Sequence, residues 1–73
     1  MDYESGISDL IIFFADVSAD AALNKDLSKF KLRINDALRF IQLYVSNHEE
    51  SETSLDLIRM GYWLFVFRET IHP

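Results

Sequence analysis

The sequence contains no cysteine, one proline and two glycines among its 73 residues. Without cysteine, the chain forms no disulfide bonds, thiolate metal sites, cysteine-based catalytic sites or thiol redox switches. The small number of glycines argues against the glycine-rich loops that hold phosphate groups, and no nucleophile elbow is present. We therefore expect a protein that is not an enzyme, has no catalytic residues and carries no cofactor.

Long hydrophobic runs are also missing, because the longest uninterrupted one extends only from Tyr62 to Phe67. A membrane-spanning helix needs about 20 predominantly apolar residues, so we expect none. The chain begins Met1-Asp2-Tyr3-Glu4, without the basic residues that open a signal peptide. These features predict a soluble, cytoplasmic protein.

Basic residues are scarce overall but concentrated in one segment. The net charge is −5, which does not provide the dense positive surface that non-specific nucleic-acid binding requires. Residues 25–39 nevertheless hold five of the seven basic side chains and only two acidic ones, so this segment carries +3. This polarity favours an acidic protein partner over a nucleic acid.

The spacing of apolar residues predicts an all-α fold. A single core in a chain this short stabilises it by only about 3–5 kcal/mol, so self-association or a partner is expected to help. We predict one helical domain over residues 1–73, a small antiparallel bundle of two long helices and an N-terminal helix, completed by dimerisation. The first helix is expected to begin near Ser5 or Ser8, with a bend at residues 18–20.

The predicted second helix shows the clearest amphipathic pattern. Its apolar face recurs every three or four residues from about Asp20 to Ser46, and we expect it to continue unbroken through Asn35-Asp36, the one place where it could break. Residues 46–53 are polar and predict a turn, with Ser51, Thr53 or Ser54 capping a third helix over residues 55–71. A short buried strand over residues 62–67 is the alternative there, but no partner strand is evident.

The back of the predicted second helix carries a second apolar stripe interleaved with basic residues. Interfaces are enriched in aromatic residues and arginine, so we interpret this face as a site for a protein partner. The predicted partner-binding residues are Lys25, Lys29, Leu32, Arg33, Arg39, Phe40 and Leu43. The alternatives are a homodimer seam and cover by another helix of the same chain.

The third predicted helix is apolar all round, which predicts burial on both sides. Its aromatic residues are interpreted as core or as an oligomer interface, and the predicted interface residues are Tyr62, Trp63, Phe65 and Phe67. Gly61 is expected to allow close approach of a neighbouring helix, because glycine otherwise destabilises a helix interior by about 1 kcal/mol.

A metal site is considered at Glu69 and His72, whose spacing places a carboxylate and an imidazole on one side of a helix. Such sites also need carboxylates on facing helices, and the core face of the second predicted helix offers none. We therefore expect no metal.

The function that fits this pattern is a small acidic regulator or inhibitor that acts by protein–protein interaction. In size and acidity the chain is similar to antitoxins, immunity proteins and phage-encoded inhibitors, although no motif points to one family. One alternative is a homo-oligomeric structural or assembly protein. Another is an oligomeric binder of a small anionic ligand such as a nucleotide, held by Lys25, Lys29, Arg33 and Arg39.

Overall fold

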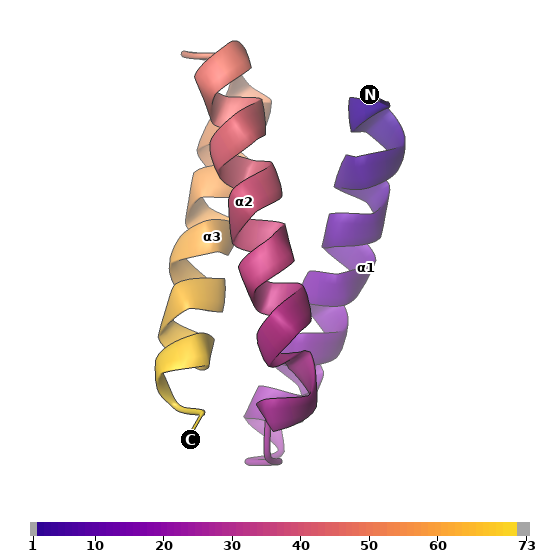
Figure 1. Ribbon diagram of the computed structural model, residues 1–73, viewed down its shortest axis with the longest axis vertical. Helices are drawn as coiled ribbons and strands as arrows, with labels where there is room; N and C mark the ends of the chain where they lie inside the picture. Colours follow the sequence, from indigo (N-terminus) through magenta and orange to yellow (C-terminus); the bar gives the residue numbers. More distant parts are fainter. Residues whose placement is uncertain (1, 72–73) are drawn as a thin grey trace.

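The computed structural model describes residues 2–71 and shows a bundle of three α-helices. The helices are α1 (Tyr3–Ala22), α2 (Lys31–Asn47) and α3 (Glu52–Glu69), and the short 3-10 helix η1 (Ser28–Phe30) precedes α2. Each helix reverses the direction of the one before it, so α2 runs antiparallel to both α1 and α3 (Figure 1). Residues 2–71 contain no strand, which confirms the all-α prediction and excludes a strand at 62–67.

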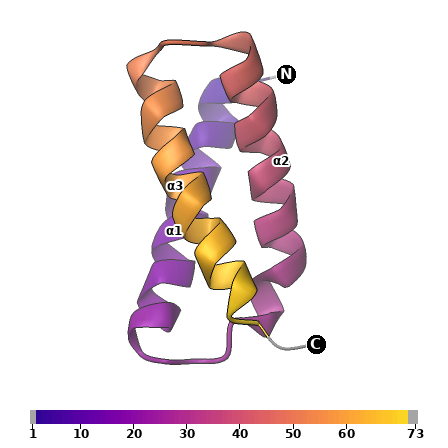
Figure 2. The same cartoon turned by 90° about the vertical axis from the view of Figure 1, so that its left-hand side faces the viewer.

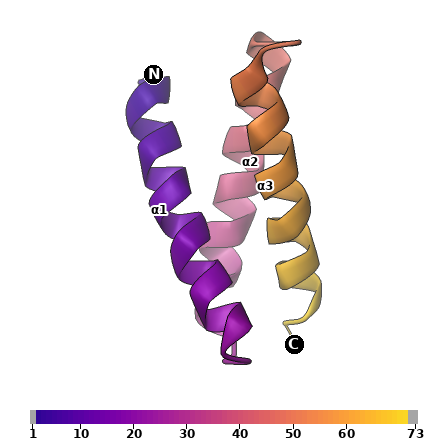
Figure 3. The same cartoon turned by 180° about the vertical axis from the view of Figure 1, so that it is seen from behind.

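The bundle is elongated, with extents of 33 × 19 × 19 Å. Figure 2 shows α3 crossing in front of α1 with α2 to one side, and Figure 3 shows α2 behind the other two helices. The start of α1 and the end of α3 lie at opposite ends of the long axis (Figure 1). In the part of the chain described, no helix is both long and apolar enough to cross a membrane.

The core lies along the axis between the three helices. It is built from side chains that recur every three or four residues, so that each helix turns one stripe inward. The buried apolar residues are Leu10, Phe13, Val17, Leu27, Phe30, Ile34, Ile41, Tyr44, Leu57 and Leu64. Within this core, the rings of Phe13 and Phe30 meet edge to face, with centroids 5.7 Å apart.

Helix α1 starts earlier and runs further than the sequence predicted. The carboxylate of Asp2 accepts a hydrogen bond from the backbone N–H of Ser5 at 3.2 Å, so Asp2 is the N-cap in place of Ser5 or Ser8. The helix then continues without interruption to Ala22. The bend predicted at residues 18–20 is therefore wrong, because the alanines there simply extend the helix.

The predicted start of the second helix near Asp20 is also wrong. The chain leaves α1 at Leu23, and Asn24 takes a left-handed conformation with φ of 56°, which ends the helix. The Asp26 carboxylate then accepts hydrogen bonds from the backbone N–H and the hydroxyl of Ser28, at 3.0 and 2.7 Å, and sets up η1. Helix α2 begins at Lys31 and passes through Asn35-Asp36 without a break, as predicted.

Three hydrogen bonds close the predicted turn between α2 and α3. The hydroxyl of Ser51 accepts from the backbone N–H of Ser54 at 3.0 Å, which makes Ser51 the N-cap of α3. The hydroxyl of Ser54, which is buried, accepts from the Ser51 hydroxyl and donates to the backbone carbonyl of His48 at 2.6 Å. Ser51, just before α3, and Ser54, in its first turn, therefore pair a backbone N–H and a backbone carbonyl that the turn would otherwise leave unpaired.

Helix α3 is buried along one face only. A Cβ atom on the buried Gly61 would lie 3.4 Å from Cδ1 of Ile41, an ordinary van der Waals contact, so the packing of α3 on α2 does not depend on glycine there in the way the sequence predicted. On the other side, Leu55, Tyr62 and Trp63 remain half exposed or more. Within one chain, the prediction that α3 is buried on both sides is therefore wrong, because two neighbouring helices cover only one side of a third.

Candidate functional site

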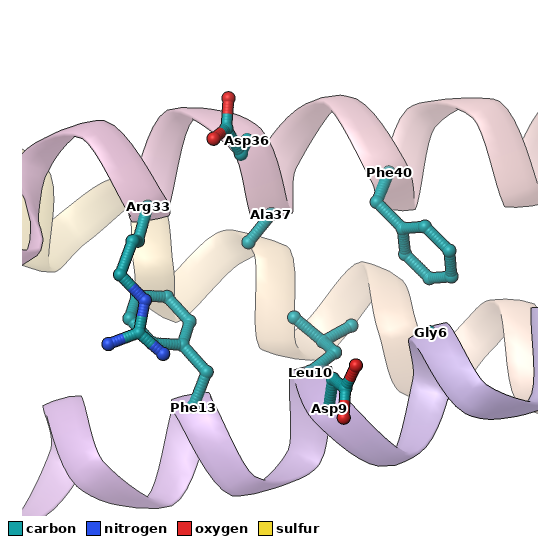
Figure 4. Close-up of a pocket in the computed structure, with 8 residues that line it drawn as sticks. All are labelled: Gly6, Asp9, Leu10, Phe13, Arg33, Asp36, Ala37 and Phe40. Atoms are coloured by element: carbon teal, nitrogen blue, oxygen red, sulfur yellow. The ribbon is translucent and has the colours of Figure 1, made fainter.

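A groove of about 280 Å³ runs between α1 and α2 (Figure 4). Each helix contributes four of its residues, a consecutive pair with one residue three positions before it and one three positions after it, so each turns one continuous side toward the groove. The lining residues are Gly6, Asp9, Leu10, Phe13, Arg33, Asp36, Ala37 and Phe40. Leu10 and Ala37 supply apolar surface in its middle, and an aromatic ring lies toward each end (Figure 4).

Phe40 closes one end of the groove against the backbone of α1. A Cβ atom at Gly6 would lie 2.6 Å from Cε2 of Phe40, so the missing side chain of Gly6 makes room for the ring. The ring of Phe40 also lies 6.3 Å from that of Tyr3 and 6.5 Å from that of Tyr44, measured between centroids. Phe40 is partly buried as a result, and α1 covers it within the same chain.

Arg33 and Phe13 form the other end of the groove. The guanidinium carbon of Arg33 lies 4.3 Å from the centroid of the Phe13 ring, a cation–π contact that holds an exposed charge over a buried aromatic side chain. Within residues 2–71, no carboxylate lies within ion-pair distance of Arg33. The groove therefore has a positive end whose charge has no counterion in the described structure.

The two acidic residues of the groove differ in their surroundings. Asp36 turns its carboxylate away from the groove (Figure 4) and lies 3.2 Å from Nη2 of Arg39, in a pair of which both members are largely exposed. Asp9 projects from α1 on the facing rim. Asp9 and Arg33 are thus the charged groups that border the groove directly, and they give it one negative rim and one positive end.

The structure divides the predicted partner-binding residues into three groups. Arg33 and Phe40 come together in the groove, whereas Leu32, Arg39 and Leu43 lie on the exposed face of α2 beside it. The other two are lysines near the end of α1: Lys25 is exposed in the loop, and Lys29 pairs with Asp20 at 3.1 Å.

The α1 side of this groove was not predicted from the sequence. Leu10 and Phe13 were visible only as part of an apolar helix, and nothing in the sequence showed which neighbour they would meet. Gly6 gave the one usable signal, because a glycine in a helix destabilises it unless something packs closely there.

The outer face of α3 is a second exposed apolar surface. We call the residues Leu55, Ile58, Tyr62, Trp63 and Phe65, whose exposed fractions range from 45% to 63%, the α3 outer face. Of the predicted oligomer-interface residues, Tyr62, Trp63 and Phe65 belong to this face. Phe67 is half buried, and its ring lies 6.0 Å from that of Trp63.

Other kinds of site find less support in the geometry. Within the part of the chain that the structure describes, no three histidine or acidic side chains gather as metal ligands would. The considered pair of Glu69 and His72 cannot be placed, because His72 lies outside the described residues. Of the four cations proposed for an anionic ligand, Lys29 and Arg39 already have carboxylate partners.

Comparisons with known proteins give no family for this chain. No protein-family model, curated protein or solved structure matches it.

Proposed function

We propose that this protein is a small, non-enzymatic regulator or inhibitor that binds another protein through the groove between α1 and α2. The observation that carries the proposal is an apolar groove with an unpaired arginine fixed at one end. The partner segment that fits presents an apolar side chain to Leu10 and Ala37 and an acidic side chain to Arg33. The protein would act in the cytoplasm, because a chain without cysteine forms no disulfide bonds and does not depend on an oxidising compartment.

The lining of the groove favours a protein partner over a cofactor. Its volume of 280 Å³ lies near the lower limit of about 300 Å³ for small-molecule pockets, so volume alone does not separate the two. Its lining contains aromatic and aliphatic groups but few hydrogen-bond donors to orient a polar ligand. A side chain anchored in a shallow apolar depression is a common way for a partner to dock.

Charge supports an acidic partner. Residues 25–39 carry five basic side chains, and Arg33 and Lys25 have no carboxylate partner in the described part of the chain. An arginine on an aromatic ring loses little freedom when it binds a carboxylate, because the ring already holds its guanidinium. Association should therefore slow as the salt concentration rises.

A peptide-display experiment tests the proposal directly. A random library of 12-residue peptides is selected against the immobilised protein, and the enriched peptides are measured again by titration. We expect them to combine a leucine or aromatic residue with a nearby Asp or Glu, and to bind the Arg33→Glu variant at least ten times more weakly. The matched control is Lys31→Glu, an equal charge change at an exposed position outside the groove, which should bind as the original protein does.

Filling the groove provides an independent test. Ala37→Met would place a longer side chain on the groove floor without changing the charge. We expect weaker peptide binding with unchanged helical circular dichroism. Enriched peptides that bind Arg33→Glu and Ala37→Met as tightly as the original protein would overturn the proposal.

A further inference from the structure

We propose that the occupant of the α1–α2 groove is a single amphipathic helix of another protein, with an acidic residue of its first turn placed at Arg33. This inference rests on the function proposed for the groove. It adds the secondary structure, the residue spacing and the direction of the bound segment, which takes the place of the fourth helix of a bundle.

The surroundings of the groove favour a helical segment over an extended one. An extended segment pairs its backbone with the edge of a β-sheet, and residues 2–71 contain no strand. Helices α1 and α2 pair their backbone groups internally, so they offer no such edge. A bound helix pairs its own backbone and presents only side chains, which an apolar lining such as that of Leu10 and Ala37 can receive.

The length of the groove matches two turns of a helix. Its lining extends from Gly6 to Phe13 along α1 and from Arg33 to Phe40 along α2, seven residue steps in each helix. At 1.5 Å per residue, each side is about 10 Å long, or two helical turns. A helix lying along the groove therefore directs three side chains into it, at positions i, i+4 and i+7.

The charge of Arg33 determines the first of these side chains. Its exposed guanidinium is held 4.3 Å from the centroid of the Phe13 ring, and within residues 2–71 no carboxylate lies within ion-pair distance of it. An acidic side chain at position i supplies this counterion. The next two positions face Leu10, Ala37 and Phe40, so apolar side chains fit there.

The charges of the groove also determine the direction of the bound helix. An acidic residue is most favourable in the first turn of a helix, near the positive end of its dipole. The N-terminal end of the bound helix therefore lies at Arg33, and the helix runs toward Phe40, parallel to α2. A reversed helix would carry its acidic residue toward the other end, where the carboxylate of Asp9 lies between Leu10 and Gly6 (Figure 4) and would repel it.

Two biased peptide libraries test the helical spacing. Their peptides are about 18 residues long, because shorter isolated helices are marginal in water. One library fixes a glutamate and two leucines at i, i+4 and i+7 in an alanine-rich background. The other fixes the same three residues at alternating positions among β-branched residues, which favour an extended chain. We expect binders from the first library only, and a proline at a central position facing away from the groove should weaken each of them at least tenfold.

The outcomes separate the helical occupant from the function on which it rests. Peptides of the second library could bind Arg33→Glu at least tenfold more weakly than Lys31→Glu, the exposed control outside the groove. That result would overturn the helical occupant and leave the proposed function standing. Binders from neither library would also overturn the helical occupant, whereas the random library decides the function of the groove.

Charge reversal and spin labels test the direction. A helical binder whose glutamate is changed to lysine should bind Arg33→Glu at least tenfold more tightly than the unchanged binder does, with no such gain for Lys31→Glu. A nitroxide on the N-terminus of the peptide should broaden the amide signals around Arg33, and one on its C-terminus those around Phe40. The opposite distribution of broadening would overturn the orientation.

Discussion

The carboxylate of Asp20 near the end of α1 lies 3.1 Å from the ammonium group of Lys29 in η1. The Asp20 side chain is only 17% exposed, and apart from the Lys29 ammonium group no hydrogen-bond donor among residues 2–71 serves its Oδ2 atom. Lys29 therefore supplies the charge that offsets a largely buried carboxylate. The pair also spans the loop between α1 and η1, where the sequence pattern predicted a helix.

Removing this cation should destabilise the fold. We expect Lys29→Met to lower the free energy of unfolding by about 1–2 kcal/mol, because it leaves the Asp20 charge buried without a partner. Urea unfolding followed by circular dichroism measures the change. Lys25→Met, at an exposed lysine outside any ion pair found in the described structure, should change stability by less than about 0.5 kcal/mol. Similar losses in both variants would mean that the Asp20–Lys29 pair does not stabilise the fold.

The buried hydroxyl of Ser54 should matter more than its size indicates. Ser54→Ala removes the donor to the carbonyl of His48 and leaves that carbonyl without this bond, so we expect a loss of about 1–2 kcal/mol. Ser46→Ala is the control, because the Ser46 hydroxyl also bonds a backbone carbonyl, that of Gln42, but at an exposed site. Thermal unfolding should show a clear decrease for Ser54→Ala and little change for Ser46→Ala.

The turn between α2 and α3 can be stabilised at Glu50. Its φ of 67° lies in the left-handed region, which costs an ordinary residue about 1–2 kcal/mol and glycine almost nothing. Glu50→Gly should therefore raise the free energy of unfolding by up to about 1 kcal/mol, after the extra freedom of glycine in the unfolded chain is subtracted. Glu49→Gly has no such strain to relieve and should lower stability. An equal decrease in both variants would contradict this explanation.

The two glycines should respond differently to alanine. At Gly61 a new Cβ would make an ordinary contact of 3.4 Å with Ile41, so the better helix propensity of alanine should raise stability by about 0.5–1 kcal/mol. At Gly6 the same Cβ would lie 2.6 Å from the Phe40 ring and force it to move. We therefore expect Gly6→Ala to raise stability less than Gly61→Ala does, or to lower it. Melting temperatures from calorimetry compare the two variants directly.

The sequence predicted the helical class, α3 and the turn before it, because these depend on local patterns. Residues 46–53 lack apolar side chains, and Ser51 was among the three expected caps. The start of α2 could not be predicted in the same way. Leu23 and Leu27 fit one helical face in the sequence, yet Leu23 is exposed and Leu27 is buried from a loop. Asn24, whose left-handed conformation ends the helix between them, does not stand out in a pattern of apolar residues.

The candidate site was predicted only in part, because it is formed by two helices. The spacing placed Arg33 and Phe40 on the back of α2, but it could not show that Gly6 would receive the Phe40 ring. Leu32 and Leu43 lie on the same predicted stripe as Phe40, yet they stay exposed. Which of these residues another helix covers depends on the tilt of α1, and tilt is a property of tertiary packing.

The uneven packing of the three helices has a consequence for local opening. Helices α2 and α3 lie side by side in the closest contact (Figure 1), whereas a groove lies between α1 and α2. Regions with fewer packed neighbours open more easily, so the backbone amides of α1 should exchange with deuterium sooner than those facing α2 in α3. A ligand bound between α1 and α2 would contact both helices. Its binding should therefore slow the deuterium exchange of the backbone amides of α1.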